Sequence, residues 1–150
     1  MKAVIQRVKS AQLSIDNQVY SQIDNGLLIL LGITHTDTTE DIEWLCKKIV
    51  NLRIFADNEG KMNLSVKDIE GDILMVSQFT LYASTKKGNR PSYLEAAPAE
   101  ISIPLYEESI RKCECELGKK IKTGRFGADM QISLLNDGPV SIIIDTKDKK

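Results

Sequence analysis

The arrangement of apolar and polar residues predicts a sheet in the first half of the chain. Residues 3–8 predict a strand, and alternation through 11–23 around a turn at Asp16-Asn17 predicts a hairpin with one face in water. Two further stretches, 27–33 and 73–76, are apolar almost throughout, which is typical of strands buried on both faces. The fold is therefore expected to have buried strands at the centre of its sheet.

The second of these stretches continues directly into polar side chains. If the strand period of two extends through Thr80, then Gln78 and Thr80 project to one side while Ser77 and Phe79 project to the other. An amide and a hydroxyl would then lie side by side at the end of a rigid element. Such a pair can hold a small polar ligand, or it can satisfy backbone groups where the strand leaves the core. The spacing leaves both interpretations open.

A helical period predicts two amphipathic helices. Apolar residues recur at intervals of three and four within 36–50, and Thr38 followed by Asp41 resembles a capping box with Asp in place of Glu. The second helix is expected to begin near Pro104, because proline fits only in a first turn, and to end at Gly118.

The remaining segments predict further strands. Residues 51–55 predict a short strand, and alternation at 130–134 predicts another. N-D-G at 136–138 predicts a turn, after which the β-branched run 139–145 predicts the last strand. The last four residues are expected to fray. The chain is therefore expected to be one β-rich α+β domain over residues 1–150.

Composition and charge exclude several classes of protein. Hydrophobic residues make up 42% and charged residues 27% of the 150 positions, as in a soluble globular domain. The N-terminal segment lacks the apolar region of a signal peptide, and no apolar run approaches the length of a membrane span, so we expect a cytosolic protein. A net charge of −1 argues against a protein that coats nucleic acid through its overall field.

The cysteines and the single histidine argue against a metal site. Cys46, Cys113 and Cys115 offer only a C-x-C pair, and His35 is the one imidazole, so we expect no metal and no cofactor. The cysteines are expected to be reduced thiols on helices, and His35 to lie in a loop between a strand and a helix. One imidazole in that position also argues against a Ser-His-Asp triad.

Segment 84–97 has neither helical nor strand periodicity, and a loop of this length is often functional. It contains one of two local clusters of basic residues. Charge alone leaves open whether these clusters bind phosphate or are simply solvated. The clusters are Lys86, Lys87 and Arg90, and then Lys119, Lys120, Lys122 and Arg125.

Several motifs, in the same order along the chain, resemble those of one family. They are S-Q-F-T-L at 77–81, K-K-G-N-R-P-S-Y at 86–93, G-R-F-G-A-D-M at 124–130 and N-D-G-P-V-S at 136–141. Together with M-K-A-V-I-Q-R-V at the N-terminus and N-L-R-I-F at 51–55, they resemble the D-aminoacyl-tRNA deacylases, also called D-tyrosyl-tRNA deacylases. The resemblance covers nearly the whole chain.

This resemblance implies a fold, an assembly and an activity. The implied fold is an α+β domain whose mainly antiparallel, barrel-like sheet carries two amphipathic helices. The implied assembly is a homodimer with active sites at the subunit interface, without membrane association. The implied activity is hydrolysis of D-amino acids, and of glycine mischarged on alanine tRNA, from their tRNA esters. The basic clusters would then contact tRNA phosphates.

The resemblance also assigns roles to residues. By position, Ser77, Gln78, Phe79 and Thr80 would line the pocket, with Gln78 and Thr80 in catalysis, and Gly138-Pro139 would enter it from the partner subunit. From the sequence alone Gly138-Pro139 is expected to be an ordinary trans turn, whereas the resemblance implies a cis bond. Neighbouring carbonyl oxygens would then fix the substrate's α-ammonium and leave no room for an L side chain.

Two departures from related patterns bear on specificity. The family motif ends G-P-V-T, whereas this chain has Ser141, which keeps the hydroxyl and loses the methyl group. A related group that removes L-alanine from threonine tRNA carries P-Q-A-T, so Ser77 and Phe79 favour the D-specific branch.

Two chemical mechanisms and two other functions remain open at this stage. Thr80 can be a nucleophile, but a hydroxyl normally needs an adjacent base. Alternatively, the 2′-hydroxyl of the terminal ribose assists a water while backbone N–H groups near Phe79 and Thr80 stabilise the oxyanion. The other functions are a non-catalytic RNA-binding dimeric module and a deacylase of mischarged L-alanyl-tRNA.

Overall fold

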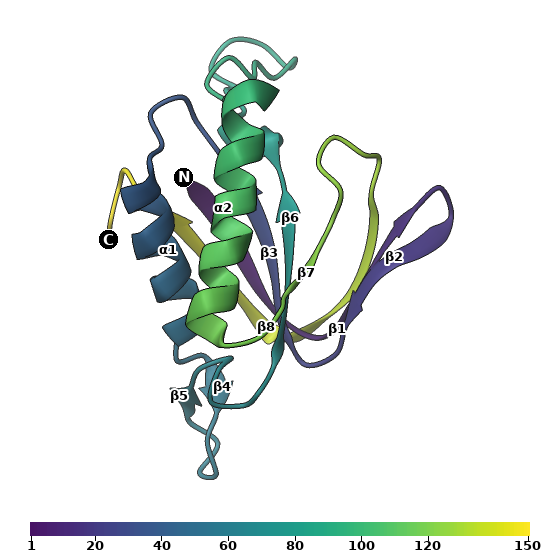
Figure 1. Ribbon diagram of the computed structural model, residues 1–150, viewed down its shortest axis with the longest axis vertical. Coiled ribbons are helices and arrows are strands. Elements are labelled where there is room, and N and C mark those ends of the chain that lie inside the picture. Colours follow the sequence, from purple (N-terminus) through teal and green to yellow (C-terminus); the bar gives the residue numbers. More distant parts are fainter.

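One long strand joins the two halves of the sheet in the computed structural model, which describes residues 1–150 (Figure 1). Strand β1 (Lys2–Ile15) pairs antiparallel with β2 (Gln18–Ile23), with β3 (Gly26–Gly32) and with β8 (Gln131–Asp145). The predicted hairpin is confirmed, and the two apolar patterns before its turn form one continuous strand of 14 residues.

The other side of β3 carries a parallel part of the sheet. Strand β6 (Asp72–Ser77) runs parallel to β3, and the two-residue strand β7 (Lys122–Thr123) runs parallel to β6. Strands β4 (Phe55–Ala56) and β5 (Met62–Leu64) form a separate small sheet. The barrel-like α+β fold implied by the resemblance is confirmed, with antiparallel pairs around β1 and parallel pairs around β6.

Alternate side chains of β3 and β6 enter two different clusters of apolar residues, and for this reason both strands are apolar almost throughout. Ile73 and Met75 belong to the larger cluster beneath the helices, whereas Leu74 and Val76 belong to a second cluster on the opposite face. All four side chains are buried. A polar residue can therefore enter this strand only where it leaves the sheet.

Helices α1 (Thr39–Asn51) and α2 (Ala99–Leu117) lie side by side on one face of the sheet (Figure 1). The capping box between Thr38 and Asp41 is confirmed. The predicted start of the second helix near Pro104 is wrong, because α2 begins five residues earlier. Its first turn is closed by Ser102, whose N–H and hydroxyl both donate to the carbonyl of Pro98, so Pro104 falls in its second turn.

Two other local predictions are wrong. Residues 51–55 do not form a strand, since α1 extends to Asn51 and β4 begins only at Phe55. The N-D-G sequence at 136–138 does not reverse the chain but lies inside β8. Strand β8 pairs with β1 on both sides of this sequence, and register shifts around Val8 absorb the extra residues as a bulge.

The cysteines are free and lie on the helices, as predicted. Cys46 of α1 and Cys113 of α2 are buried where the helices meet, and the Cys46 thiol donates to the carbonyl of Ser109 at 3.4 Å. A hydrogen bond with Cys46, together with burial, raises the pKa of Cys113. Cys115 is exposed. Neither helix has the length and apolar character that a bilayer-spanning helix needs.

An ionic cluster connects the two ends of the chain to the start of α1. The ammonium group of Met1 donates to Asp37 at 2.5 Å and to the Thr146 hydroxyl at 2.6 Å, and both Met1 and the Asp37 side chain are fully buried. Lys147 binds Asp41 at 2.7 Å. The expectation that all of the last four residues fray is therefore wrong for Lys147, because two carboxylates hold its ammonium group.

The state of Asp41 makes the free energy of unfolding depend on pH. Burial alone would raise the pKa of Asp41, but hydrogen bonds from Lys147, Thr146 and the backbone of Thr38 outweigh burial and hold it well below its usual value. Because the pKa is lower in the folded state, the stabilisation is present above the unfolded-state value near 3.9. It is lost as the pH falls below about 4.

We therefore expect the free energy of unfolding to fall between about pH 5 and pH 2, with Asp41 contributing roughly 1–3 kcal/mol of that fall. Urea unfolding at a series of pH values measures it. Asp41→Asn should be less stable than the parent at pH 7 and should lose less on acidification. Asp16→Asn, an exposed turn residue, serves as the matched control. Parallel curves for the parent and Asp41→Asn would contradict this assignment.

Candidate active site

The candidate site lies where β6 leaves the sheet. Ser77 is the last residue of the strand, and the N–H of Gln78 donates to the carbonyl of Leu31 at 2.8 Å. The chain then turns into a short 3₁₀ helix, η1 (Phe79–Tyr82). The expectation that the strand period continues through Thr80 is therefore wrong, since the extended backbone ends three residues earlier.

The Gln78 and Thr80 side chains nevertheless lie side by side. The Gln78 amide Nε2 donates to the Thr80 hydroxyl Oγ1 at 2.6 Å. The tight turn after the strand brings the two residues together, where a continuing strand was expected to do so. The amide and the hydroxyl are therefore neighbours, as predicted, but the backbone that brings them together is a 3₁₀ turn and not a continuing strand.

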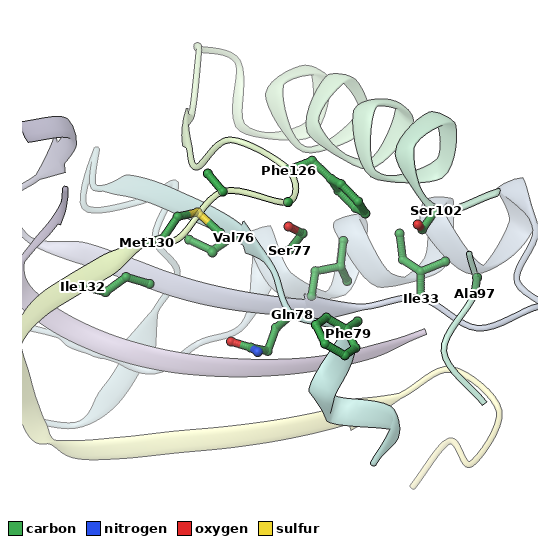
Figure 2. A pocket seen from close by; sticks show the side chains of 13 residues that line it. Ile33, Val76, Ser77, Gln78, Phe79, Ala97, Ser102, Phe126, Met130 and Ile132 are labelled. Atoms are coloured by element: carbon green, nitrogen blue, oxygen red, sulfur yellow. The ribbon is translucent and has the colours of Figure 1, made fainter. Parts of the chain in front are cut away.

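A cavity of about 270 Å³ opens beside this end of β6 (Figure 2). It exists because β7 pairs only with Leu74 and Met75, which leaves the outer edge of Val76 and Ser77 without a neighbouring strand. Ser77, Gln78 and Phe79 line the cavity, whereas Thr80 does not line it and contacts it only through its hydrogen bond with Gln78.

Most of the cavity wall is apolar and comes from distant parts of the chain. Ile33 follows β3, Ala97 precedes α2, and Phe126 and Met130 belong to the segment between β7 and β8. Ser102 of α2 adds a hydroxyl, which already donates a hydrogen bond to the carbonyl of Pro98. In the motif G-R-F-G-A-D-M the sequence suggests a role only for Arg125, whereas in the structure Phe126 and Met130 of this motif form part of the cavity wall. A few polar groups in an apolar hollow are typical of a small-molecule site.

The loop 84–97 packs beside the opening of the cavity, against Phe79. Its limbs are joined by two backbone hydrogen bonds between Ser84 and Ser92, and Tyr93 packs edge-to-face on Phe79 with ring centroids 5.0 Å apart. His35 lies in the loop between β3 and α1, as predicted, and its ring Nε2 is 3.1 Å from the carbonyl oxygen of Leu94.

No strong base is placed to activate Thr80. Its Oγ1 accepts a hydrogen bond from the Gln78 amide, and no carboxylate, imidazole or amine makes a hydrogen bond with it. An amide is not a proton acceptor of useful strength in either orientation of the Gln78 side chain. The geometry therefore favours a role for Thr80 in orienting Gln78 over a role as a nucleophile.

The Gly138–Pro139 peptide bond is cis, so the expectation of a trans bond from the sequence alone is wrong and the expectation from the resemblance is met. Neither residue lines the cavity of its own chain. The residue before them, Asp137, is held by Arg7, whose guanidinium donates to the carbonyls of Asp137 at 3.0 Å and Ile54 at 2.5 Å and lies 3.3 Å from the Asp137 carboxylate. Sequence reasoning missed Arg7, although a basic residue between the buried positions Ile5 and Val8 was a usable signal.

The structure separates the two basic clusters. Lys86, Lys87 and Arg90 are exposed on the loop beside Phe79 and take part in no ion pair, and Arg125 adjoins Phe126 of the cavity wall. Lys119 and Lys120 follow the C-terminal end of α2, whereas the loop 84–97 precedes its N-terminal end. The two ends are about 27 Å apart along the helix axis. Lys119 and Lys120 pair with Asp72 and Glu114. Lys122 is exposed on β7 near this second group.

Comparison with known proteins gives this geometry a context. The profile described as D-Tyr-tRNA(Tyr) deacylase matches residues 4–145. The chain belongs to this family. Among curated relatives, the D-aminoacyl-tRNA deacylases of Bacteroides fragilis (strain YCH46) and Flavobacterium psychrophilum are 62% and 61% identical, each over the full length of both chains.

Solved structures show the family fold as well. A protein titled "c-Myc DNA Unwinding Element Binding Protein" is 41% identical, with a TM-score of 0.89 over 97% of this chain and 98% of its own. A probable eukaryotic D-amino acid tRNA deacylase has a TM-score of 0.83 at 16% identity, over 95% of this chain and 97% of its own, and so shares the fold. The fold of this chain is thus found in solved structures at both moderate and low sequence identity.

The contact between Arg7 and Gly138 predicts the effect of one substitution. A Cβ atom added to Gly138 would lie 2.7 Å from Nη2 of Arg7, which its hydrogen bonds hold in place, and Gly138 has a φ of +120°. We expect Gly138→Ala to lower the free energy of unfolding by about 2 kcal/mol more than Gly60→Ala. Gly60 also has a positive φ but has open space around it.

Urea unfolding of both variants measures the difference. Gly60→Ala carries the cost of a positive φ without any steric contact, so it is the control for the combined effect of φ +120° and the contact with Arg7 at Gly138. Equal losses in the two variants would show that the guanidinium moves aside at no cost.

Proposed function

We propose that this chain hydrolyses the ester bond of D-aminoacyl-tRNA in the cytoplasm, releasing the free D-amino acid and tRNA, and that it also clears glycine from mischarged alanine tRNA. The observation that carries this proposal is the placement of the S-Q-F-T segment, on a turn at the end of a buried strand and beside an apolar cavity. Membership of the deacylase family and the names of its relatives support it.

The chemistry uses backbone donors more than side chains. The first hydrogen bond of η1 runs from the N–H of Leu81 to the carbonyl of Gln78, so the N–H groups of Phe79 and Thr80 have no partner within the turn. They can stabilise the oxyanion of the tetrahedral intermediate, at typically about 3 kcal/mol per donor. The ester carbon is attacked by water, which the neighbouring 2′-hydroxyl of the terminal ribose assists.

Gln78 and Thr80 act as one unit in this mechanism. The hydrogen bond between them fixes the amide, and the fixed amide orients the ester at the end of β6. Ser77 and Phe79 form the walls beside it. Thr80 then supports the reaction without forming an acyl intermediate.

The active enzyme is a homodimer in this proposal. Gly138 and Pro139 do not reach the cavity of their own chain, and β8 is an edge strand on which Leu135 and Ile143 are exposed by 59% and 75%. A second copy covering this edge would bring Gly138-Pro139 to the neighbouring cavity. There its carbonyl oxygens would bind the substrate's α-ammonium and leave no space for an L side chain.

Chiral discrimination predicts the result of a direct assay. We expect rapid hydrolysis of D-tyrosyl-tRNA and no hydrolysis of L-tyrosyl-tRNA above the buffer rate. In Thr80→Ala we expect the rate to fall by roughly 10- to 100-fold, not to vanish, because the backbone donors remain. Single-turnover release of labelled tyrosine measures both quantities. Complete loss of turnover with normal binding of a substrate analogue would establish Thr80 as the nucleophile instead.

The same assay separates the two other functions. If neither tyrosyl ester nor L-alanyl-tRNA is cleaved above buffer, the chain is a non-catalytic RNA-binding module. If L-alanyl-tRNA is cleaved and the D ester is not, it belongs with the L-alanine deacylases.

Recognition of the tRNA body is assigned to phosphate contacts near the cavity. Lys86, Lys87, Arg90 and Arg125 are close enough to its mouth to hold the backbone of an acceptor stem, and they carry the main share in this proposal. Lys119, Lys120 and Lys122 lie at the far end of α2 and carry a smaller share. Two of these three are already paired with carboxylates.

This assignment predicts how binding responds to salt. Affinity for uncharged tRNA should fall steeply as salt rises, and Lys86→Ala with Lys87→Ala should reduce the slope of log K against log[salt] by about 1 to 2. Lys119→Ala with Lys120→Ala is the matched control and should leave the slope nearly unchanged. Fluorescence anisotropy of labelled tRNA measures both slopes, and a flat response in the parent would refute the phosphate contacts.

A further inference from the structure

Three large apolar side chains are exposed together at the mouth of the cavity. Phe79 and Tyr93, which we call the aromatic rim, are exposed by 55% and 39%, and the adjacent Leu94 is exposed by 87%. Phe79 also lines the cavity, where Figure 2 shows it beside Gln78, so the rim is continuous with the candidate site. Exposed aromatic groups at the edge of a site are available for stacking against a flat ligand.

The rim is fixed by contacts on both sides of Tyr93. Before it, Ser84 and Ser92 exchange backbone hydrogen bonds of 2.8 and 2.9 Å. After it, the Thr34 hydroxyl donates to the carbonyl of Glu95 at 2.5 Å, and the N–H of Ala97 donates to the carbonyl of Ile33. Because these bonds tie the loop to the end of β3, the ring of Tyr93 is held in place before any ligand binds.

The charges around the rim favour a polyanion. Lys86, Lys87 and Arg90 lie on the same loop without ion-pair partners, and Glu95 is the only acidic residue in segment 84–97. A nucleic-acid strand offers both a phosphate backbone and stacking bases.

We propose that the aromatic rim binds the unpaired bases that precede the terminal adenosine of the tRNA. This inference rests on the proposed function, in which the terminal nucleoside carries the ester into the cavity. The nucleotides before it are single-stranded, so their bases are free to stack on Tyr93 and Phe79 while Lys86, Lys87 and Arg90 hold their phosphates. Stacking makes the contact tolerant of base identity, as an enzyme that acts on many tRNAs needs.

Two minimal substrates test the rim separately from catalysis. One is the D-tyrosyl ester of adenosine, and the other is the same ester on the trinucleotide C-C-A. In the parent we expect kcat/KM to be roughly tenfold higher for the trinucleotide. In Tyr93→Ala this ratio should fall by roughly threefold, mainly through KM, because Phe79 and the basic residues of the loop still contact the added nucleotides, whereas Tyr93→Phe should keep it. Tyr20→Ala removes another exposed tyrosine, which is 51% exposed on β2 away from the loop, and should keep the ratio as well.

The outcomes separate this inference from the proposed function. An unchanged ratio in Tyr93→Ala would overturn the rim while leaving the deacylase activity intact. If neither ester is cleaved by the parent, the proposed function fails. Fluorescence anisotropy of a labelled C-C-A trinucleotide then tests whether the rim binds these nucleotides, and equal binding by the parent and Tyr93→Ala would overturn the inference. A change in the molecular mass of Tyr93→Ala by light scattering would assign the rim to subunit contact, and would overturn the inference too.

Discussion

The parallel pairing of β3 with β6 determines where chemistry can take place in this fold. Both strands are covered on both faces, so polar side chains are excluded along their length and permitted only at their ends. Ser77 and Gln78 occupy that end. The cavity, the turn of η1 and the attachment of loop 84–97 all meet at the same edge, because the sheet stops there.

Prediction from the sequence succeeded where local patterns agree with tertiary pairing. The apolar runs of β3 and β6 and the capping box of α1 were predicted from residues that interact within a few positions, or with any apolar neighbour. The side-by-side arrangement of Gln78 and Thr80 was also predicted, although from a strand period that the backbone does not follow. The prediction survived because residues two apart come close in a tight turn as well.

The predictions that were wrong concern segments where long-range contacts decide the structure. The N-D-G sequence is a strong local turn signal, but β1 offers pairing partners on both sides of it, and this long-range pairing outweighs the local preference. The apolar wall of the cavity and the contacts of Arg7 join residues 30 to 130 positions apart, so no window of sequence shows them. Two of the groups that Arg7 binds are backbone carbonyls, which the amino-acid sequence does not distinguish from any others.

The two-residue length of β7 has a consequence for how such a site can change. Pairing by β7 ends at Met75, and the cavity occupies the edge that β7 leaves uncovered. Adding two residues to β7 would extend the sheet along Val76 and Ser77 and fill the hollow with backbone. The volume open to a substrate thus depends on the length of a neighbouring strand, so an insertion or deletion near residue 123 would resize the site without any change in the S-Q-F-T segment.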